Sequence, residues 1–121
     1  MSKKPIIFAN WKMYKNIRES VNDSLRILSL LEEPDKVESI ILPSFTSIYA
    51  VNQILKSKSL KVGAQDVFWD ESGAYTGEVS ASQLKEAGCD YVLIGHAIRR
   101  KLFQESYDVI AMKFNTKTTQ S

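Results

Sequence analysis

The sequence predicts an α/β fold in which a parallel sheet is built from four strand–helix units. Short apolar runs alternate along the whole chain with segments of helical periodicity. Strict alternation of this kind is typical of a parallel sheet with right-handed crossovers. The glycine-rich dinucleotide fingerprint is absent after every expected strand, so a nucleotide-binding doubly wound fold is the weaker choice.

The first unit begins at a continuous apolar run, residues 6–9, which predicts a strand buried on both faces. Residues 10–14 leave this strand as a loop. Asn16 is expected to cap the next helix, with Glu19 as its capping-box partner three positions on. The helix ends before Pro34, and its apolar stripe comprises Val21, Leu25, Leu28 and Leu31.

The second and third units follow the same plan. Residues 39–42 form the second expected strand, closed by Pro43, and residues 60–64 form the third. Gly63 inside the third strand indicates a close backbone approach. The intervening helix has an apolar face made by Ile48, Val51 and Leu55.

A long loop, residues 65–79, separates the third strand from the next helix. Most loops have about 4–6 residues, so a loop of this length usually has a task. It carries Phe68, Trp69 and Tyr75. Exposed aromatic side chains on such a loop would indicate an interface. The alternative is that the loop folds its aromatic side chains back on its own body, and the pattern leaves both open.

The fourth unit starts with a second capping box, from Ser80 to Gln83, and Gly88 ends that helix. Residues 91–94 form the fourth expected strand, which stops at Gly95 and is followed by His96, the single histidine of the chain. Titratable groups at the carboxyl ends of strands are the layout of a βα-barrel active site.

One continuous helix is expected over residues 98–114, and residues 1–114 are expected to form one domain. The positions that support the helix are Leu102, Val109, Ile110 and Lys113. Residues 115–121 are polar and have no apolar period, which predicts a frayed tail.

Composition excludes several classes of protein. The formal net charge is +2 and the charges are mixed, so neither nucleic acid nor a membrane is expected as a partner. The apolar runs are too short to span a bilayer, and the first ten residues lack the features of a secretory signal. The single cysteine, Cys89, predicts a reducing, cytoplasmic setting and is expected to be a small buried residue rather than a reactive thiol. We expect no cofactor and no metal.

Three motifs resemble the triosephosphate isomerase family, in the right order and at the right spacing. They are Phe-Ala-Asn-Trp-Lys-Met at 8–13, Val-Gly-Ala-Gln-Asp at 62–66 with Gly-Ala-Tyr-Thr-Gly-Glu at 73–78, and Tyr91 to His96 with Arg99 and Arg100. The resemblance covers about residues 5–113. It implies a (β/α)8 barrel, a fold of about 250 residues, of which this chain resembles the N-terminal half, four strand–helix units.

The family resemblance also implies an activity and roles for residues. The family interconverts dihydroxyacetone phosphate and glyceraldehyde 3-phosphate in glycolysis and gluconeogenesis, as a homodimer. His96 matches the neutral electrophile, Lys12 the residue that holds the substrate phosphate, and Asn10 the residue that orients the substrate oxygens. Without the resemblance, a lone histidine is more often structural and a loop lysine is usually solvated surface.

Further positions match the supporting parts of the family site. Gln65, Arg99 and Glu105 match supporting polar residues, and an Arg99–Glu105 ion pair is expected, buried or on an exposed helix surface. Tyr75, Thr76 and Gly77 match the loop that docks into the neighbouring subunit and braces its Asn10 and Lys12 region.

The chain departs from the family pattern in two respects. No residue aligns with the catalytic glutamate after the sixth strand, with the mobile lid, or with the later phosphate-binding loops. The family signature Gly-His-Ser-Glu-Arg-Arg reads Gly-His-Ala-Ile-Arg-Arg at 95–100, so Ala97 and Ile98 replace a serine and a glutamate. The loss of that glutamate removes a charge partner of Lys12 and Arg99.

Three functional hypotheses therefore stand together. The chain is a truncated member of the isomerase family, inactive alone because no base is placed to deprotonate the substrate carbon. Alternatively it is a catalytically dead half-barrel that associates through the loop 66–79 with itself or with a full-length isomerase, or it is a gene fragment. Four strands alone leave two sheet edges open, so we expect the chain either to be unstable or to complete its sheet by association.

Overall fold

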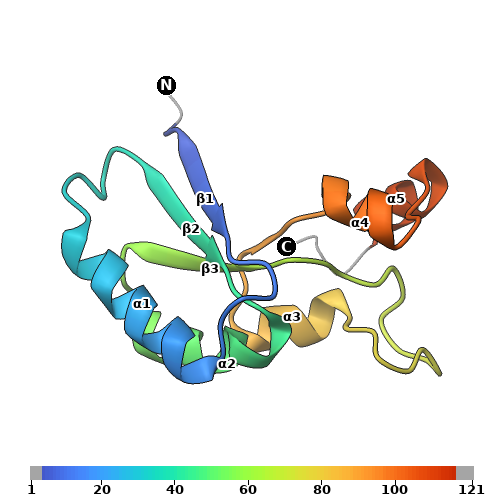
Figure 1. Ribbon diagram of the computed structural model, residues 1–121, viewed down its shortest axis with the longest axis horizontal. Coiled ribbons are helices and arrows are strands. Elements are labelled where there is room, and N and C mark those ends of the chain that lie inside the picture. The colour runs from blue at the N-terminus through green and yellow to red at the C-terminus, as the bar shows by residue number, and fades with distance from the viewer. Residues whose placement is uncertain (1–3, 117–121) are drawn as a thin grey trace.

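The computed structural model describes residues 4–116 and contains one curled sheet of four parallel strands. The strands are β1 (Ile6–Asn10), β2 (Glu38–Leu42), β3 (Leu60–Ala64) and β4 (Tyr91–Val92), adjacent in that order. Helices α1 (Ile17–Leu30), α2 (Phe45–Leu55) and α3 (Ala81–Ala87) cover one face, as Figure 1 shows, while α4 (Ala97–Leu102) and α5 (Tyr107–Phe114) lie apart from that layer. The predicted strand–helix alternation and parallel half-barrel are confirmed.

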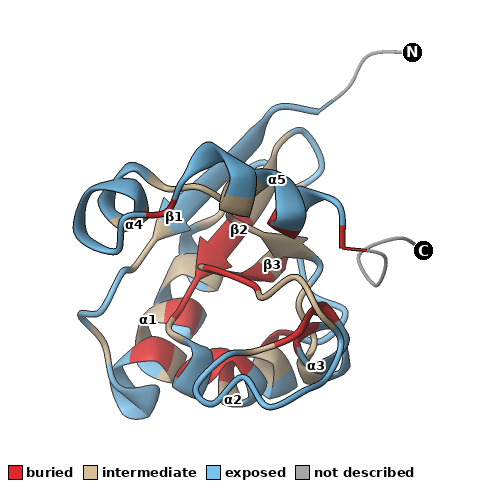
Figure 2. Cartoon of the chain, turned by 90° about the vertical axis from the view of Figure 1, so that its right-hand side faces the viewer, coloured by how far each residue is buried: buried red, intermediate tan, exposed pale blue. Residues whose placement is uncertain are grey.

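The core lies between the sheet and its helix layer. Register pairs Asn10 with Leu42 and Ile41 with Val62, so the strands end together at one edge. Because side chains alternate between the faces of a strand, every second residue points at the helices. Figure 2 shows this buried layer, whose main members are Ile41, Ile48, Val51, Leu55, Leu60, Val62, Ala64 and Leu84.

Local signals placed the helix ends correctly. The Asn16 side chain accepts from Glu19 N at 2.9 Å and Glu19 Oε1 accepts from Asn16 N at 3.0 Å, so the predicted capping box is present. Ser80 and Gln83 form the second box, and Gly88 closes α3 with φ +111. Gly63 is the predicted close approach, since a Cβ there would lie 2.9 Å from the Tyr91 carbonyl oxygen.

The predicted stripe of α1 is partly wrong. Leu25 is 46% exposed, whereas Ser20 and Ser24 are fully buried. The Ser24 hydroxyl donates to the Ser20 carbonyl at 2.6 Å, which satisfies it within the helix. Small residues on the buried side allow α1 to pack closely on its neighbour, and an apolar-only pattern does not register them.

The prediction that the first strand is buried on both faces is wrong. Ile6, Ile7 and Phe8 are 57%, 61% and 53% exposed. β1 is an edge strand, paired with β2 on one side alone in the described part of the chain. A continuous apolar run indicates which surroundings a strand suits, whereas its exposure depends on the neighbours that are present, and among residues 4–116 β1 has a neighbouring strand on one side.

The fourth unit differs from its prediction in two places. Ladder pairing of β4 covers Tyr91 and Val92 instead of residues 91–94. The expected helix over 98–114 is broken into α4 and α5. Gln104 has φ +54, outside the helical region, and the Ser106 hydroxyl accepts from Val109 N at 3.3 Å as a new N-cap. Ser106 was the sequence signal for this break.

Three remaining expectations concern the C-terminal tail, Cys89 and membrane-spanning helices. Of the predicted tail, Thr116 is buried, and residues 117–121 lie outside the described residues. Cys89 packs half-buried against the core, and burial, followed by the nearby Asp90 charge, raises the pKa of its thiol to about 12. A raised thiol pKa lowers the fraction of the reactive thiolate, which agrees with the predicted unreactive residue. Among residues 4–116, no helix is long and apolar enough to cross a membrane.

Candidate active site

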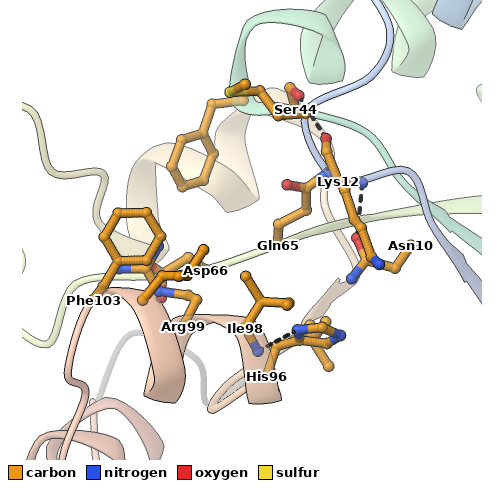
Figure 3. A pocket seen from close by; sticks show the side chains of 13 residues that line it. Asn10, Lys12, Ser44, Gln65, Asp66, His96, Ile98, Arg99 and Phe103 are labelled. Carbon is orange, nitrogen blue, oxygen red and sulfur yellow. Dashed lines mark hydrogen bonds and ion pairs between the residues drawn. The ribbon is translucent and has the colours of Figure 1, made fainter.

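A cleft of about 450 Å³ opens at the carboxyl edge of the sheet. Asn10 stands at the end of β1, Gln65 directly after β3 and His96 shortly after β4, so parallel strands bring distant residues to one place. Figure 3 shows these side chains around the cleft together with Lys12 from the loop after β1. The structure therefore brings together the predicted residues Asn10, Lys12, Gln65 and His96.

The Lys12 loop is held by hydrogen bonds from three directions. Lys12 has φ +52, a left-handed conformation that costs a non-glycine residue about 1–2 kcal/mol. The Asn10 side chain accepts from Lys12 N at 2.9 Å. The Lys12 carbonyl accepts from Ser44 Oγ at 3.0 Å and from Gln65 Nε2 at 2.9 Å. The strained turn is thus fixed, and it places an exposed ammonium group at the cleft.

One hydrogen bond identifies which ring nitrogen of His96 is engaged by the backbone and which is available to a ligand. His96 is the N-cap of α4, and its Nδ1 accepts from Ile98 N at 3.1 Å. A backbone N–H can only donate, so Nδ1 carries no proton in this arrangement. The neutral ring then has its proton on Nε2, which is the atom able to donate to a substrate oxygen.

One wall of the cleft is apolar. Ile98 is 40% exposed and lies between Gln65 and His96 in the view of Figure 3. No ion pair to Lys12 is found among residues 4–116. The remaining apolar lining residues are Met13, Phe45, Leu93, Leu102 and Phe103. The site therefore combines an unpaired lysine and a histidine with a hydrocarbon surface.

A mostly buried cluster of four charges borders the cleft, and two of its members, Asp66 and Arg99, line it. Arg99 Nε lies 2.8 Å from Glu105 Oε2, so the predicted ion pair is present. Lys113 Nζ lies 2.6 Å from Glu105 Oε2 and 2.7 Å from Asp66 Oδ1, and Arg99 also reaches Asp66 at 3.2 Å. The cluster joins the start of the long loop to α4 and α5. Sequence reasoning missed Asp66 and Lys113; a lysine on an apolar helical stripe was the available signal.

The cluster predicts acid lability. Burial alone would raise the pKa of Glu105, but hydrogen bonds from Lys113 and Arg99 outweigh it, and the pKa is lowered from its usual 4.5. A lowered carboxyl pKa contributes stability above 4.5 that is lost as pH falls through the folded-state pKa. We expect the melting temperature of Glu105→Gln to lie below that of the parent near neutral pH and to approach it in acid. Thermal melts followed by circular dichroism across that range measure the difference.

The matched control is Glu33→Gln. Glu33 pairs with Lys36 at 3.2 Å on the surface, with side chains 66% and 74% exposed. Such a pair contributes little. Its removal should leave the pH profile of the melting temperature unchanged, and a Glu105→Gln profile parallel to the parent's would contradict the role assigned to the cluster.

The aromatic side chains of the long loop pack against one another. Phe68 stacks on Trp69 with ring centroids 4.0 Å apart and packs against Tyr75 at 4.4 Å. The Tyr75 hydroxyl donates to Asp70 at 2.6 Å, and this bond raises its pKa. The aromatic side chains therefore fold mainly on one another. Residues 71–78, which include Thr76 and Gly77, form an exposed tip outside the cleft lining.

Within the described range, no group of three or more histidine, cysteine, aspartate or glutamate side chains is placed to hold a metal ion. Lys12 can attract an anion, His96 can donate a proton in a hydrogen bond, and Asn10 fixes the loop between them. The carboxylate in the lining, Asp66, is held by two cations.

Comparison with known proteins follows this geometry. The family model described as triosephosphate isomerase matches residues 5–121. The triosephosphate isomerase of Dictyoglomus turgidum is 42% identical over 114 residues, which are 94% of this chain and 46% of that relative. The one from Acidithiobacillus ferrooxidans is 44% identical over 108 residues, 89% of this chain and 42% of the relative. The crystal structure of the Bartonella henselae isomerase superposes with a TM-score of 0.84 at 34% identity, covering 94% of this chain and 47% of that one.

Proposed function

Because the chain belongs to the triosephosphate isomerase family and spans about half the length of the curated relatives that it matches, we propose that its cleft is the substrate-binding half of an isomerase site. The ligand is a triose phosphate, dihydroxyacetone phosphate or glyceraldehyde 3-phosphate. The observation that carries this proposal is the convergence of Asn10, Lys12 and His96 on one cleft.

Each group has a role in this half-site. Lys12 binds the phosphate and stabilises negative charge that develops on the substrate oxygen. His96 donates its Nε2 proton in a hydrogen bond to the carbonyl oxygen, since Nδ1 is engaged by Ile98 N. Gln65 is a positioning residue, because its side chain holds the Lys12 and Leu42 carbonyls at 2.9 and 2.8 Å.

Replacing Lys12 by methionine is expected to weaken binding of dihydroxyacetone phosphate at least about tenfold, because one ammonium–phosphate contact is worth about 1.5–3 kcal/mol. Titration by two-dimensional NMR measures the dissociation constant. Lys58→Met is the control, since Lys58 is an exposed lysine that follows α2 and is not part of the cleft lining. Equal affinities of the parent and Lys12→Met would refute the phosphate role.

We further propose that the 121 residues alone do not turn over substrate. The cleft is lined by a single carboxylate, Asp66, and Arg99 and Lys113 occupy its two oxygens. Ile98 adds an apolar group where the family has an acid. A bound triose phosphate would therefore meet an electrophile and a cation but no free base.

A second candidate function is association through the loop 66–79, either with another copy or with a full-length isomerase, as in the homodimer that the family resemblance implies. The observation that favours it is the exposed tip, residues 71–78, carried on the Phe68–Trp69–Tyr75 stack. Deletion of residues 71–78 should abolish such association, which sedimentation of the parent and the deletion variant measures. We also propose a cytoplasmic location, since a single cysteine is typical of proteins from reducing compartments.

A further inference from the structure

The direction of the His96 side chain depends on the two peptide groups that flank its Cα. Its φ is −56° and its ψ is 144°. The first turn of α4 holds the peptide group after it, because the His96 carbonyl accepts from Arg99 N at 2.9 Å and from Arg100 N at 3.2 Å. The ring itself is held by Ile98 N, through the hydrogen bond drawn in Figure 3. Backbone groups of α4 therefore restrain the ψ and the ring of His96, but not its φ.

The peptide group before His96 is held by a side chain. Arg100 Nε donates to the Gly95 carbonyl at 3.1 Å. Because a peptide group is planar, the direction of that carbonyl also determines where His96 N lies. The guanidinium group is always charged, and a charged donor makes a stronger hydrogen bond than a neutral one. Arg100 thus ties the turn that carries His96 to the helix that His96 caps.

Gly95 needs a restraint of this kind because its backbone is permissive. It has φ +72°, a left-handed conformation that glycine adopts readily. Helix α5 packs against it, since a Cβ at Gly95 would lie 3.2 Å from Ile110 Cδ1 and 3.3 Å from Ile110 Cγ2. This packing limits movement of the Gly95 Cα but does not orient the Gly95 carbonyl. The orientation of the carbonyl depends on Arg100.

The two consecutive arginines make separate contacts. Arg99 lines the cleft and pairs with Asp66 and Glu105. Arg100 is exposed and is not part of the cleft lining. It therefore reaches a ligand in the cleft only through the turn at Gly95, which makes it a positioning group and not a catalytic one.

We propose that Arg100 is a positioning residue for His96. Its hydrogen bond to the Gly95 carbonyl keeps the ring where Nδ1 accepts from Ile98 N, so that the proton of the neutral ring stays on Nε2. The use of that proton on a triose phosphate rests on the proposed function, whereas the positioning is a property of the chain without ligand. The two are therefore open to separate tests.

Hydrogen exchange and ring-nitrogen NMR of the ligand-free full chain test the proposal, and the single histidine makes the ring signals unambiguous. In Arg100→Met, the Ile98 amide should exchange about fivefold faster than in the parent, the effect of losing one hydrogen bond. A fraction of the neutral rings should then carry the proton on Nδ1. Arg100→Lys should restore most of the protection, because its ammonium group can also donate to the Gly95 carbonyl. Arg26→Met is the matched control, since Arg26 is an exposed arginine of α1 outside the cleft lining.

The Phe103 amide is an internal reference, because it donates to the Arg99 carbonyl at 3.0 Å within α4. Equal acceleration at Ile98 and Phe103 would overturn the proposal, since Arg100 would then only stabilise α4. Unchanged Ile98 exchange in a folded Arg100→Met variant would overturn it as well.

A measurement on the parent needs no variant. The Nε–H of Arg100 should exchange more slowly than that of Arg26, and equal rates would remove the hydrogen bond on which the positioning role depends. None of these readouts involves a ligand. Failure of dihydroxyacetone phosphate to bind would therefore count against the proposed function and leave the positioning of His96 intact.

Discussion

Replacing Lys113 by methionine is expected to destabilise the chain by about 3–5 kcal/mol, the usual cost of removing one partner from a buried ion pair. The Lys113 side chain is 3% exposed and contacts both Glu105 and Asp66. Methionine fills a similar volume but leaves two carboxylates to share Arg99. Glu105 Oε1 already has no hydrogen-bond partner among the described residues. No other donor there is placed to replace Lys113 when its ammonium group is removed. Urea denaturation measures the loss.

Two further variants separate charge from packing. Adding Glu105→Gln to Lys113→Met restores charge balance, with Asp66 facing Arg99, so the double variant should be less destabilised than the sum of the single changes. Lys36→Met removes an exposed pair with Glu33 and should cost less than about 1 kcal/mol. A Lys113→Met variant as stable as Lys36→Met would show that the buried cluster does not stabilise the fold.

The parts of the fold that local chemistry determines could be predicted from the sequence. The capping boxes at Asn16 and Ser80 need a side chain and a backbone group three residues apart, and both are present. The apolar run of β1 predicted burial wrongly, because burial of a strand depends on neighbours elsewhere in space, whereas the count of four strands predicted an open edge there. The break between α4 and α5 lies between these cases, since Ser106 is a local cap signal that the apolar spacing concealed.

The candidate site likewise has features that the sequence predicts and features that depend on tertiary packing. Asn10, Lys12 and His96 lie at or after the carboxyl ends of strands in one parallel sheet, so their convergence at one edge follows from the topology that the alternation predicts. The contact of Glu105 with Lys113 depends on how α5 packs against α4 and the start of the long loop, which no local pattern specifies. The hydrogen bond from Ile98 N to His96 also depends on the cap position, and it was not anticipated.

The purified chain is expected to give no turnover above background in a coupled assay of triose phosphate isomerisation. The physical reason is the absence of a free carboxylate in the cleft, because abstraction of a carbon-bound proton needs a placed base. Mixing the chain with the second half of the Dictyoglomus turgidum relative should restore turnover, since the family resemblance implies that such a half carries the catalytic glutamate and the strands that complete the barrel. Steady-state rates at increasing ratios of the two halves measure the effect.

His96→Ala tests whether the restored activity uses this chain's own site. The variant should lower the turnover of the mixture by about 10²–10⁴-fold, the range typical of a positioned proton donor. Cys89→Ser is the control, because its thiol packs against the core outside the cleft lining and should leave the rate unchanged. Circular dichroism must first show that both variants fold as the parent does. Turnover by the chain alone would disprove the need for a further base, and full activity with His96→Ala would show that His96 does not act on the substrate. Because the His96 side chain also caps α4 by accepting from Ile98 N, the folding check must cover residues 97–102 before a rate loss is attributed to the lost Nε2 donor.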